Sequence, residues 1–202
     1  MDKNIVFIDW DGTLCWGKFW ESLLHKDVAL TKAVTNFFSF EKEMVDNWMH
    51  GKLSSEQIVK FISNRSGLSE EILWKTFVAD CQKMHVEPEV ISLIKKLKEK
   101  HIAILVTGNM DCFSRFTVPA LGLDKVFDHI INSSDVGYLK NEYNGKTFVD
   151  CFNQYNITDT SRSYLLDDSD RNCKVFSKLG GKAIKINKKE DTINHLKIIS
   201  EI

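Results

Sequence analysis

The spacing of apolar and polar positions predicts two kinds of structure along the chain. Short apolar runs rich in β-branched residues are typical of buried strands in a parallel sheet. We expect five such strands, at residues 5–8, 102–106, 129–132, 163–166 and 182–186. Between them apolar residues recur at spacings of three and four, as at Val90, Leu93, Ile94 and Leu97, which predicts amphipathic helices. Strands and helices that alternate in this way indicate βαβ units and an α/β fold with a parallel sheet.

Residues 16–85 have a different pattern, in which no convincing strand occurs and helical periods dominate. Ser54 opens one helix, and Gly67 follows its end. We therefore predict an all-α insertion at residues 16–85, here named the cap, within an α/β core formed by residues 1–15 and 86–202.

Composition narrows the class of protein. The chain has 202 residues, of which 43% are hydrophobic and 27% charged, as expected for one soluble domain with a modest insertion. A net charge of −1 gives no global field that favours nucleic acid or an anionic membrane. The five cysteines contain no Cys-x-x-Cys pair, which argues against a disulfide framework and structural zinc. The first residues lack the apolar stretch of a signal peptide, and no run is long enough to span a bilayer. We therefore expect a cytoplasmic protein that binds neither a membrane nor nucleic acid.

The first predicted strand ends in two acids, Asp9 and Asp11, which stand two positions apart. Both carboxylates can approach one point beyond the strand, where they repel each other unless a cation lies between them. Oxygen ligands of this kind suit Mg²⁺, and a carboxylate at such a metal can attack a phosphoryl group. The alternative is an Asp-rich turn, because Asp11-Gly12 is also a common turn pair.

Three further polar segments follow predicted strands. They are Thr107-Gly108-Asn109, Lys140 and Asp167-Asp168. The carboxyl ends of parallel strands meet at one edge of a sheet, so these segments and Asp9 converge there. A hydroxyl and backbone amides can bind an anion, and an ammonium suits both a phosphate and a carboxylate. Lys146 remains an alternative to Lys140, and each segment alone could be a helix cap or a surface group.

These segments resemble the motifs of the haloacid dehalogenase-like hydrolase superfamily over nearly the whole chain. The motifs that carry the resemblance are Asp9-Trp10-Asp11-Gly12-Thr13, Thr107 within Leu105-Val106-Thr107-Gly108-Asn109, Lys140, and Leu165-Leu166-Asp167-Asp168-Ser169. One departure is Asn141, which stands where the family usually has a proline. The resemblance implies a Rossmann-like core, a mobile helical cap and Mg²⁺ as cofactor.

The resemblance also implies a phosphatase that hydrolyses a small phosphorylated metabolite through an aspartyl-phosphate. Asp9 would be the nucleophile and Asp11 the general acid and base. The full set of expected residues comprises the catalytic Asp9, Asp11, Thr107 and Lys140; the substrate-binding Gly108, Asn109 and Trp10; and the metal ligands Asp9, Asp11, Asp168 and Asp167, with Asp11 acting through its backbone carbonyl.

Two other functions stay open at this point. A phosphomutase would use the same aspartyl-phosphate and return the phosphoryl group to a sugar. A non-catalytic module could bind a phosphorylated ligand or a partner through the aromatic residues of the cap, which are Phe37, Phe38, Phe40, Trp48 and Trp74. Aromatic residues at helical spacing are more typical of a core than of a binding surface.

Overall fold

A five-stranded parallel sheet forms the centre of the computed structural model, which describes residues 3–24 and 26–202. The strand order is β3-β2-β1-β4-β5. The strands are β1 (Asn4–Ile8), β2 (His101–Thr107), β3 (His129–Asn132), β4 (Tyr164–Asp167) and β5 (Lys182–Lys185). Each lies within one or two residues of its predicted range, and the predicted α/β class is confirmed. Residues 1–2 of the predicted core and His25 of the predicted cap lie outside the described residues.

β1 lies at the centre of the sheet and sets the place of the polar residues that follow the strands. Ile8 is in register with Leu105 of β2 on one side and with Leu166 of β4 on the other. The Asp9 amide continues this pairing by donating to the Leu166 carbonyl at 2.9 Å. Asp9 therefore emerges between the carboxyl ends of β2 and β4.

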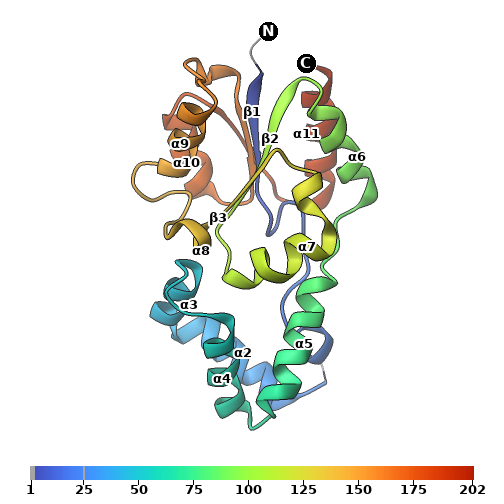
Figure 1. Cartoon of the computed structure of the whole chain (residues 1–202), viewed down its shortest axis with the longest axis vertical. Helices are drawn as coiled ribbons and strands as arrows, with labels where there is room; N and C mark the ends of the chain where they lie inside the picture. Colours follow the sequence, from blue (N-terminus) through green and yellow to red (C-terminus); the bar gives the residue numbers. More distant parts are fainter. Residues whose placement is uncertain (1–2, 25) are drawn as a thin grey trace.

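Helices cover both faces of the sheet (Figure 1), with α9 and α10 on one face and α6 and α11 on the other. Alternate residues of β1 serve the two layers: Phe7 packs edge-on against Phe148, Phe152 and Phe176, whereas Val6 and Ile8 belong to the opposite apolar cluster. The helices of the core are α6 (Pro88–Leu97), η1 (Phe113–Thr117), α7 (Val118–Leu121), η2 (Leu123–Lys125), α8 (Ser133–Val136), α9 (Lys146–Gln154), η3 (Thr160–Arg162), α10 (Asp170–Lys178) and α11 (Lys189–Glu201).

In the part of the chain that the structure describes, five helices precede α6 and lie beyond the carboxyl ends of the strands (Figure 1). They are α1 (Glu21–Leu24), α2 (Val28–Phe40), α3 (Lys42–Met49), α4 (Ser55–Ser66) and α5 (Glu70–Gln82). As predicted, Ser54 begins α4 and Gly67 follows its end, with a left-handed φ of 74°. Ser54 and Gln57 form a capping box at the start of this helix.

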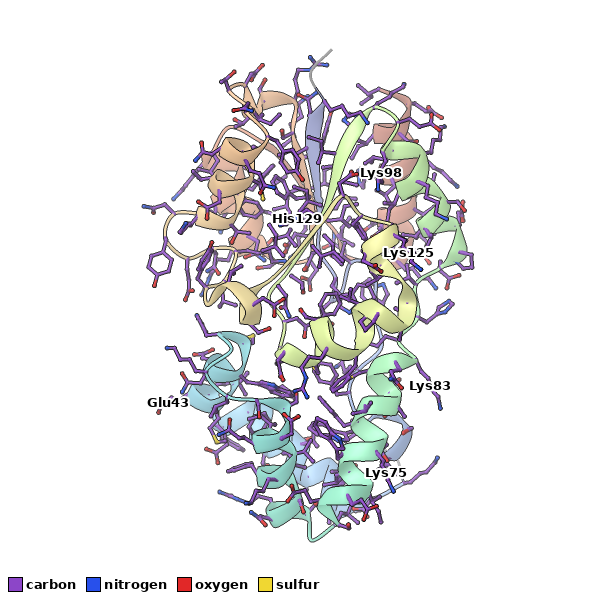
Figure 2. The ribbon with its side chains drawn as sticks, viewed as in Figure 1. Glu43, Lys75, Lys83, Lys98, Lys125 and His129 are labelled. Carbon is purple, nitrogen blue, oxygen red and sulfur yellow. The ribbon has the colours of Figure 1, made fainter. Side chains whose placement is uncertain are left out.

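The cap helices enclose an apolar cluster of their own. Trp20, Trp48 and Phe77 are fully buried in it, whereas Phe40 is 77% exposed. The cluster also includes Met110 and Cys112 of the core. Charged side chains such as those labelled at Glu43, Lys75 and Lys83 in Figure 2 lie on the outside of the cap. Of the helices in residues 3–24 and 26–202, none combines the length and apolarity that crossing a bilayer requires.

Candidate active site

A buried lysine joins two carboxylates at the carboxyl edge of the sheet. Lys140 Nζ lies 2.6 Å from Asp9 Oδ1 and 2.6 Å from Asp167 Oδ2, and it also donates to the Val106 carbonyl at 3.3 Å. The Lys140 side chain is only 5% exposed. Lys146 lies instead on the surface of α9, where it pairs with Asp150. The structure thus brings Lys140 and not Lys146 to the edge of the sheet.

Asp9, Asp167 and Asp168 form a cluster of carboxylates, in which one oxygen from each residue lies within 4.8 Å of the others. Gly12 makes room for this cluster, since a Cβ there would lie 2.6 Å from Asp168 Oδ2. With a φ of 68°, Gly12 also holds a left-handed conformation that favours glycine. Three carboxylate oxygens this close form a donor set that could hold a hard divalent cation.

The electrostatics of the cluster favour such a cation. Burial raises the pKa of Asp9, against the attraction of Lys140, and partial burial together with Asp167 raises the pKa of Asp168. Although burial alone would lower the pKa of Lys140, the Asp9 and Asp167 carboxylates raise it, so Lys140 stays charged. One ammonium faces three carboxylates, and a divalent cation would offset the remaining negative charge.

The two neighbouring acids after β4 have different surroundings. Asp167 is fully buried and accepts from Lys140, from the Ser169 amide at 2.8 Å and from Asn172 Nδ2 at 3.0 and 3.1 Å. Asp168 is exposed. Asp167 is therefore held by protein donors, and Asp168 has more of its carboxylate free for a metal ion.

Asp11 lies outside the cluster of three carboxylates. Its Oδ2 accepts from Asn109 Nδ2 at 2.9 Å, so the end of β2 orients this side chain. Part of Asp11 remains exposed, yet the protein around it limits hydration and, with Asp168, raises its pKa to about 6 against the attraction of Lys140 and Lys18. A carboxyl group with this pKa can exchange a proton at neutral pH.

The segment after β2 supplies a free hydroxyl. Thr107 is buried, and its Oγ1 has no hydrogen-bond partner among the described residues, which leaves it available to a ligand oxygen. Gly108 follows, and a Cβ there would lie 3.3 Å from Leu139. The backbone amide of Asn109 donates to Asn132 Oδ1 at 3.2 Å, so this amide is already paired, and its side-chain Nδ2 donates to Asp11.

Trp10 is not brought to this site. Its side chain is fully buried in the apolar core, where its ring lies 5.0 Å from that of Phe113. Trp10 stands between Asp9 and Asp11, and in an extended segment successive side chains face opposite sides. This alternation was a signal that could have placed Trp10 in the core. Asn172 was missed as a partner of Asp167, since no pattern links a helix residue to an acid five positions before it.

Comparisons with known proteins agree with this arrangement. Residues 3–180 match the haloacid dehalogenase-like hydrolase family. No curated protein sequence matches the chain.

Several solved structures share the fold. An HAD family enzyme from Bacteroides thetaiotaomicron, in complex with magnesium and inorganic phosphate, is 17% identical with a TM-score of 0.68, over 91% of this chain and 93% of that one. A predicted HAD-like family hydrolase from Porphyromonas gingivalis is 15% identical with a TM-score of 0.74, over 98% of both chains. A 2-haloacid dehalogenase from Pseudomonas syringae pv. Tomato DC3000 is 14% identical with a TM-score of 0.63, over 98% and 97%.

Proposed function

Because the chain belongs to the haloacid dehalogenase-like hydrolase family, we propose that it is a Mg²⁺-dependent phosphatase acting on a small phosphomonoester. The observation that carries the proposal is the second acid, Asp11, which Asn109 orients two residues beyond the buried Asp9. Phosphomonoester hydrolysis needs a proton donor for the leaving oxygen and a base for water. Cleavage of a carbon–halogen bond needs no such acid, which makes dehalogenation the less favoured reaction.

In the proposed reaction Asp9 attacks phosphorus in line, and the bond to the leaving oxygen breaks as an aspartyl-phosphate forms. In this proposal Lys140 favours the ionised form of Asp9, against the effect of burial, and with the Thr107 hydroxyl would offset charge on the phosphoryl oxygens. Asp9 and Asp168, with the backbone carbonyl of Asp11, are the proposed ligands of Mg²⁺. When bound, Mg²⁺ supplies positive charge that offsets the carboxylates and the phosphate.

Asp11 completes the cycle in two steps. Protonated Asp11 first gives its proton to the departing alkoxide, and the resulting carboxylate then takes a proton from the water that attacks the aspartyl-phosphate. In this proposal the hydrogen bond from Asn109 fixes the orientation of the Asp11 side chain in both steps.

We also propose that residues 16–85 act as a cap that excludes bulk water and contacts the non-reacting part of the substrate. The expected partner is a small phosphorylated metabolite of the cytoplasm. Gly108, one of the residues expected to bind this substrate, directly follows Thr107, whose hydroxyl has no partner among the described residues.

The test is phosphate release by the purified protein with Mg²⁺, from an aryl phosphate and then from a panel of phosphorylated metabolites. We expect turnover that Asp9→Asn lowers by at least about 100-fold, since a covalent route is lost. Circular dichroism of the variant serves as the control for its fold.

Other functions give other results in the same experiment. Halide release from a 2-haloacid would favour a dehalogenase, and transfer of phosphate between sugar hydroxyls without release would favour a phosphomutase. Binding of phosphorylated ligands without either reaction would indicate a non-catalytic module.

A further inference from the structure

The cap touches the core close to Lys140 through one charged pair. His50, directly after α3, places its Nε2 3.0 Å from Glu142 Oε2 and 3.2 Å from Glu142 Oε1. The other ring nitrogen, Nδ1, lies 2.6 Å from the Asp46 carbonyl in the last turn of α3. The imidazole is therefore fixed at both ends, and its side chain is only 15% exposed.

Glu142 also closes the turn that carries Lys140. The Leu139 amide donates to Glu142 Oε2 at 2.8 Å, and the Glu142 amide donates to the Leu139 carbonyl at 3.0 Å. Lys140 and Asn141 lie inside this closed turn. Asn141 lacks the fixed φ that the proline usual in the family would provide, so the side chain of Glu142 supplies a constraint that the backbone does not.

Close packing fixes the end of α3 against α8 (Figure 1). A Cβ at Gly51 would overlap the Ser134 carbonyl oxygen, and Ser133 Oγ donates to the Met49 carbonyl at 2.7 Å. The neighbours of His50 in sequence are thus pressed against the core, and His50 meets Glu142 only when the cap is seated in this way.

We infer that Glu142 is a positioning residue, which fixes the turn that carries Lys140. His50 pairs with Glu142 when the cap is closed, and this pair couples cap closure to the position of the turn. The inference rests on the proposed phosphatase reaction, because Lys140 acts there on Asp9. A seated cap would then tighten the hold on Lys140, and an open cap would release it.

The charges around the pair give this link a pH dependence. The groups that face His50 are the Asp46 carbonyl and Lys52 on the cap and Glu142 on the core. Burial lowers the pKa of His50, but the Asp46 carbonyl and Glu142 outweigh it and raise the pKa. The Asp46 carbonyl belongs to the cap, so only the contribution of Glu142 to the pKa of His50 depends on closure. The pair with Glu142 therefore stabilises closure while His50 is protonated, and this effect is lost as pH rises through the raised pKa of His50.

The first experiment compares Glu142→Ala, Glu142→Gln and the wild type, with Glu89→Gln as matched control. Glu89 pairs with Lys197 between α6 and α11, away from the site. We expect Glu142→Ala to lower kcat at least about tenfold with a smaller change in KM, because Lys140 loses its position relative to Asp9. Glu142→Gln keeps an acceptor for the Leu139 amide and should restore most of kcat, and Glu89→Gln should match the wild type.

A wild-type kcat in Glu142→Ala would overturn the positioning role. If Glu142→Ala does not fold, Glu142→Asp replaces it, since its shorter carboxylate does not reach both the Leu139 amide and His50. It should lose kcat, and a wild-type kcat would count against the inference.

The second experiment needs no activity. The pKa of His50, followed by its imidazole NMR signals, should fall in Glu142→Gln, and amide exchange at Leu139 should accelerate in His50→Gln. An unchanged pKa together with unchanged exchange would disprove the link between cap and turn. If the wild type releases no phosphate from any ester, the proposed function fails while these two measurements still decide the link.

Discussion

Lys140 is the residue on which the site depends most, because it lies between two buried carboxylates. Asp9 and Asp167 each approach its ammonium at 2.6 Å, and Asp167 is fully buried. Removing one partner of a buried ion pair leaves the other uncompensated, which typically costs about 3–5 kcal/mol. Here the ammonium has two such partners.

We therefore expect Lys140→Met to lower the free energy of unfolding by about 3 kcal/mol and to abolish turnover. The matched control is Lys146→Met, which removes an exposed pair with Asp150 and a contact of the ammonium with the Tyr138 ring, and should leave both stability and activity nearly unchanged. Urea unfolding at pH 7 with EDTA, beside assays with Mg²⁺, measures both effects. Equal behaviour of the two variants would mean that Lys140 is not paired in this way in solution.

Asp11→Asn should change the reaction in a different manner. An aryl phosphate has a good leaving group that needs little acid assistance, so Asp9 should still be phosphorylated, whereas alkyl phosphates should react at least about 100-fold more slowly. Hydrolysis of the aspartyl-phosphate should then lag and produce a burst in rapid-quench measurements. An equal loss for aryl and alkyl esters without a burst would contradict the acid and base role of Asp11.

The sequence predicted which segments meet, but not how their side chains pair. Asp9, Thr107 and Asp167 could be placed because each follows an apolar run, and parallel strands bring their ends together. The hydrogen bond between Asn109 and Asp11 depends on rotamers, which no periodicity encodes. Lys140 and Lys146 could not be separated because the loop between β3 and α9 has no repeating pattern.

At the scale of elements, the close approach of the end of α3 to α8 requires a glycine at position 51. Gly51 has a φ of 69°, and a Cβ there would overlap the Ser134 carbonyl oxygen. Gly67, with a φ of 74° at the end of α4, has no atom within 4 Å of the place of a Cβ. The two glycines share the same backbone requirement, and only Gly51 has a neighbour in the way.

Gly67→Ala should thus lower the free energy of unfolding by about 1 kcal/mol, the usual cost of a left-handed alanine. Gly51→Ala should cost more and also separate the cap from the core. Urea unfolding gives the first effect, and limited proteolysis of the linkers around residues 16–20 and 83–87 gives the second. Equal stability and equal cleavage in both variants would show that this contact is not kept in solution.

Element boundaries in the sheet and in α4 followed from the sequence, since apolar runs and caps define them locally. The angle between cap and core could not be predicted from the sequence. It depends on contacts such as Ser133 with Met49, which join positions 84 residues apart. Of the cap aromatics, Phe37 and Trp48 are buried as expected for a core, but Phe40 is exposed.

For the whole molecule, the carboxylate cluster should couple metal binding to stability. A ligand that binds only the folded state stabilises it by about 2.7 kcal/mol at 100 times its Kd. We expect Mg²⁺ to raise the unfolding temperature in the wild type and to have little effect in Asp168→Ala, as calorimetry with and without EDTA can show.

Ca²⁺ should also bind but inhibit, because it favours bidentate carboxylates and would occupy both oxygens of Asp9. Equal turnover with the two ions would count against this ligand set.

The strand order β3-β2-β1-β4-β5 has a consequence for biosynthesis. The ribosome makes β1 well before both of its neighbours in the sheet, which lie at residues 101–107 and 164–167. Until then a nascent chain carries an apolar strand with two unpaired edges, which is the kind of segment that chaperones protect from aggregation. Asp9 meets Asp167 and Asp168 only after the β4 segment has left the exit tunnel. Catalysis by this site therefore cannot begin until the chain has been translated through β4.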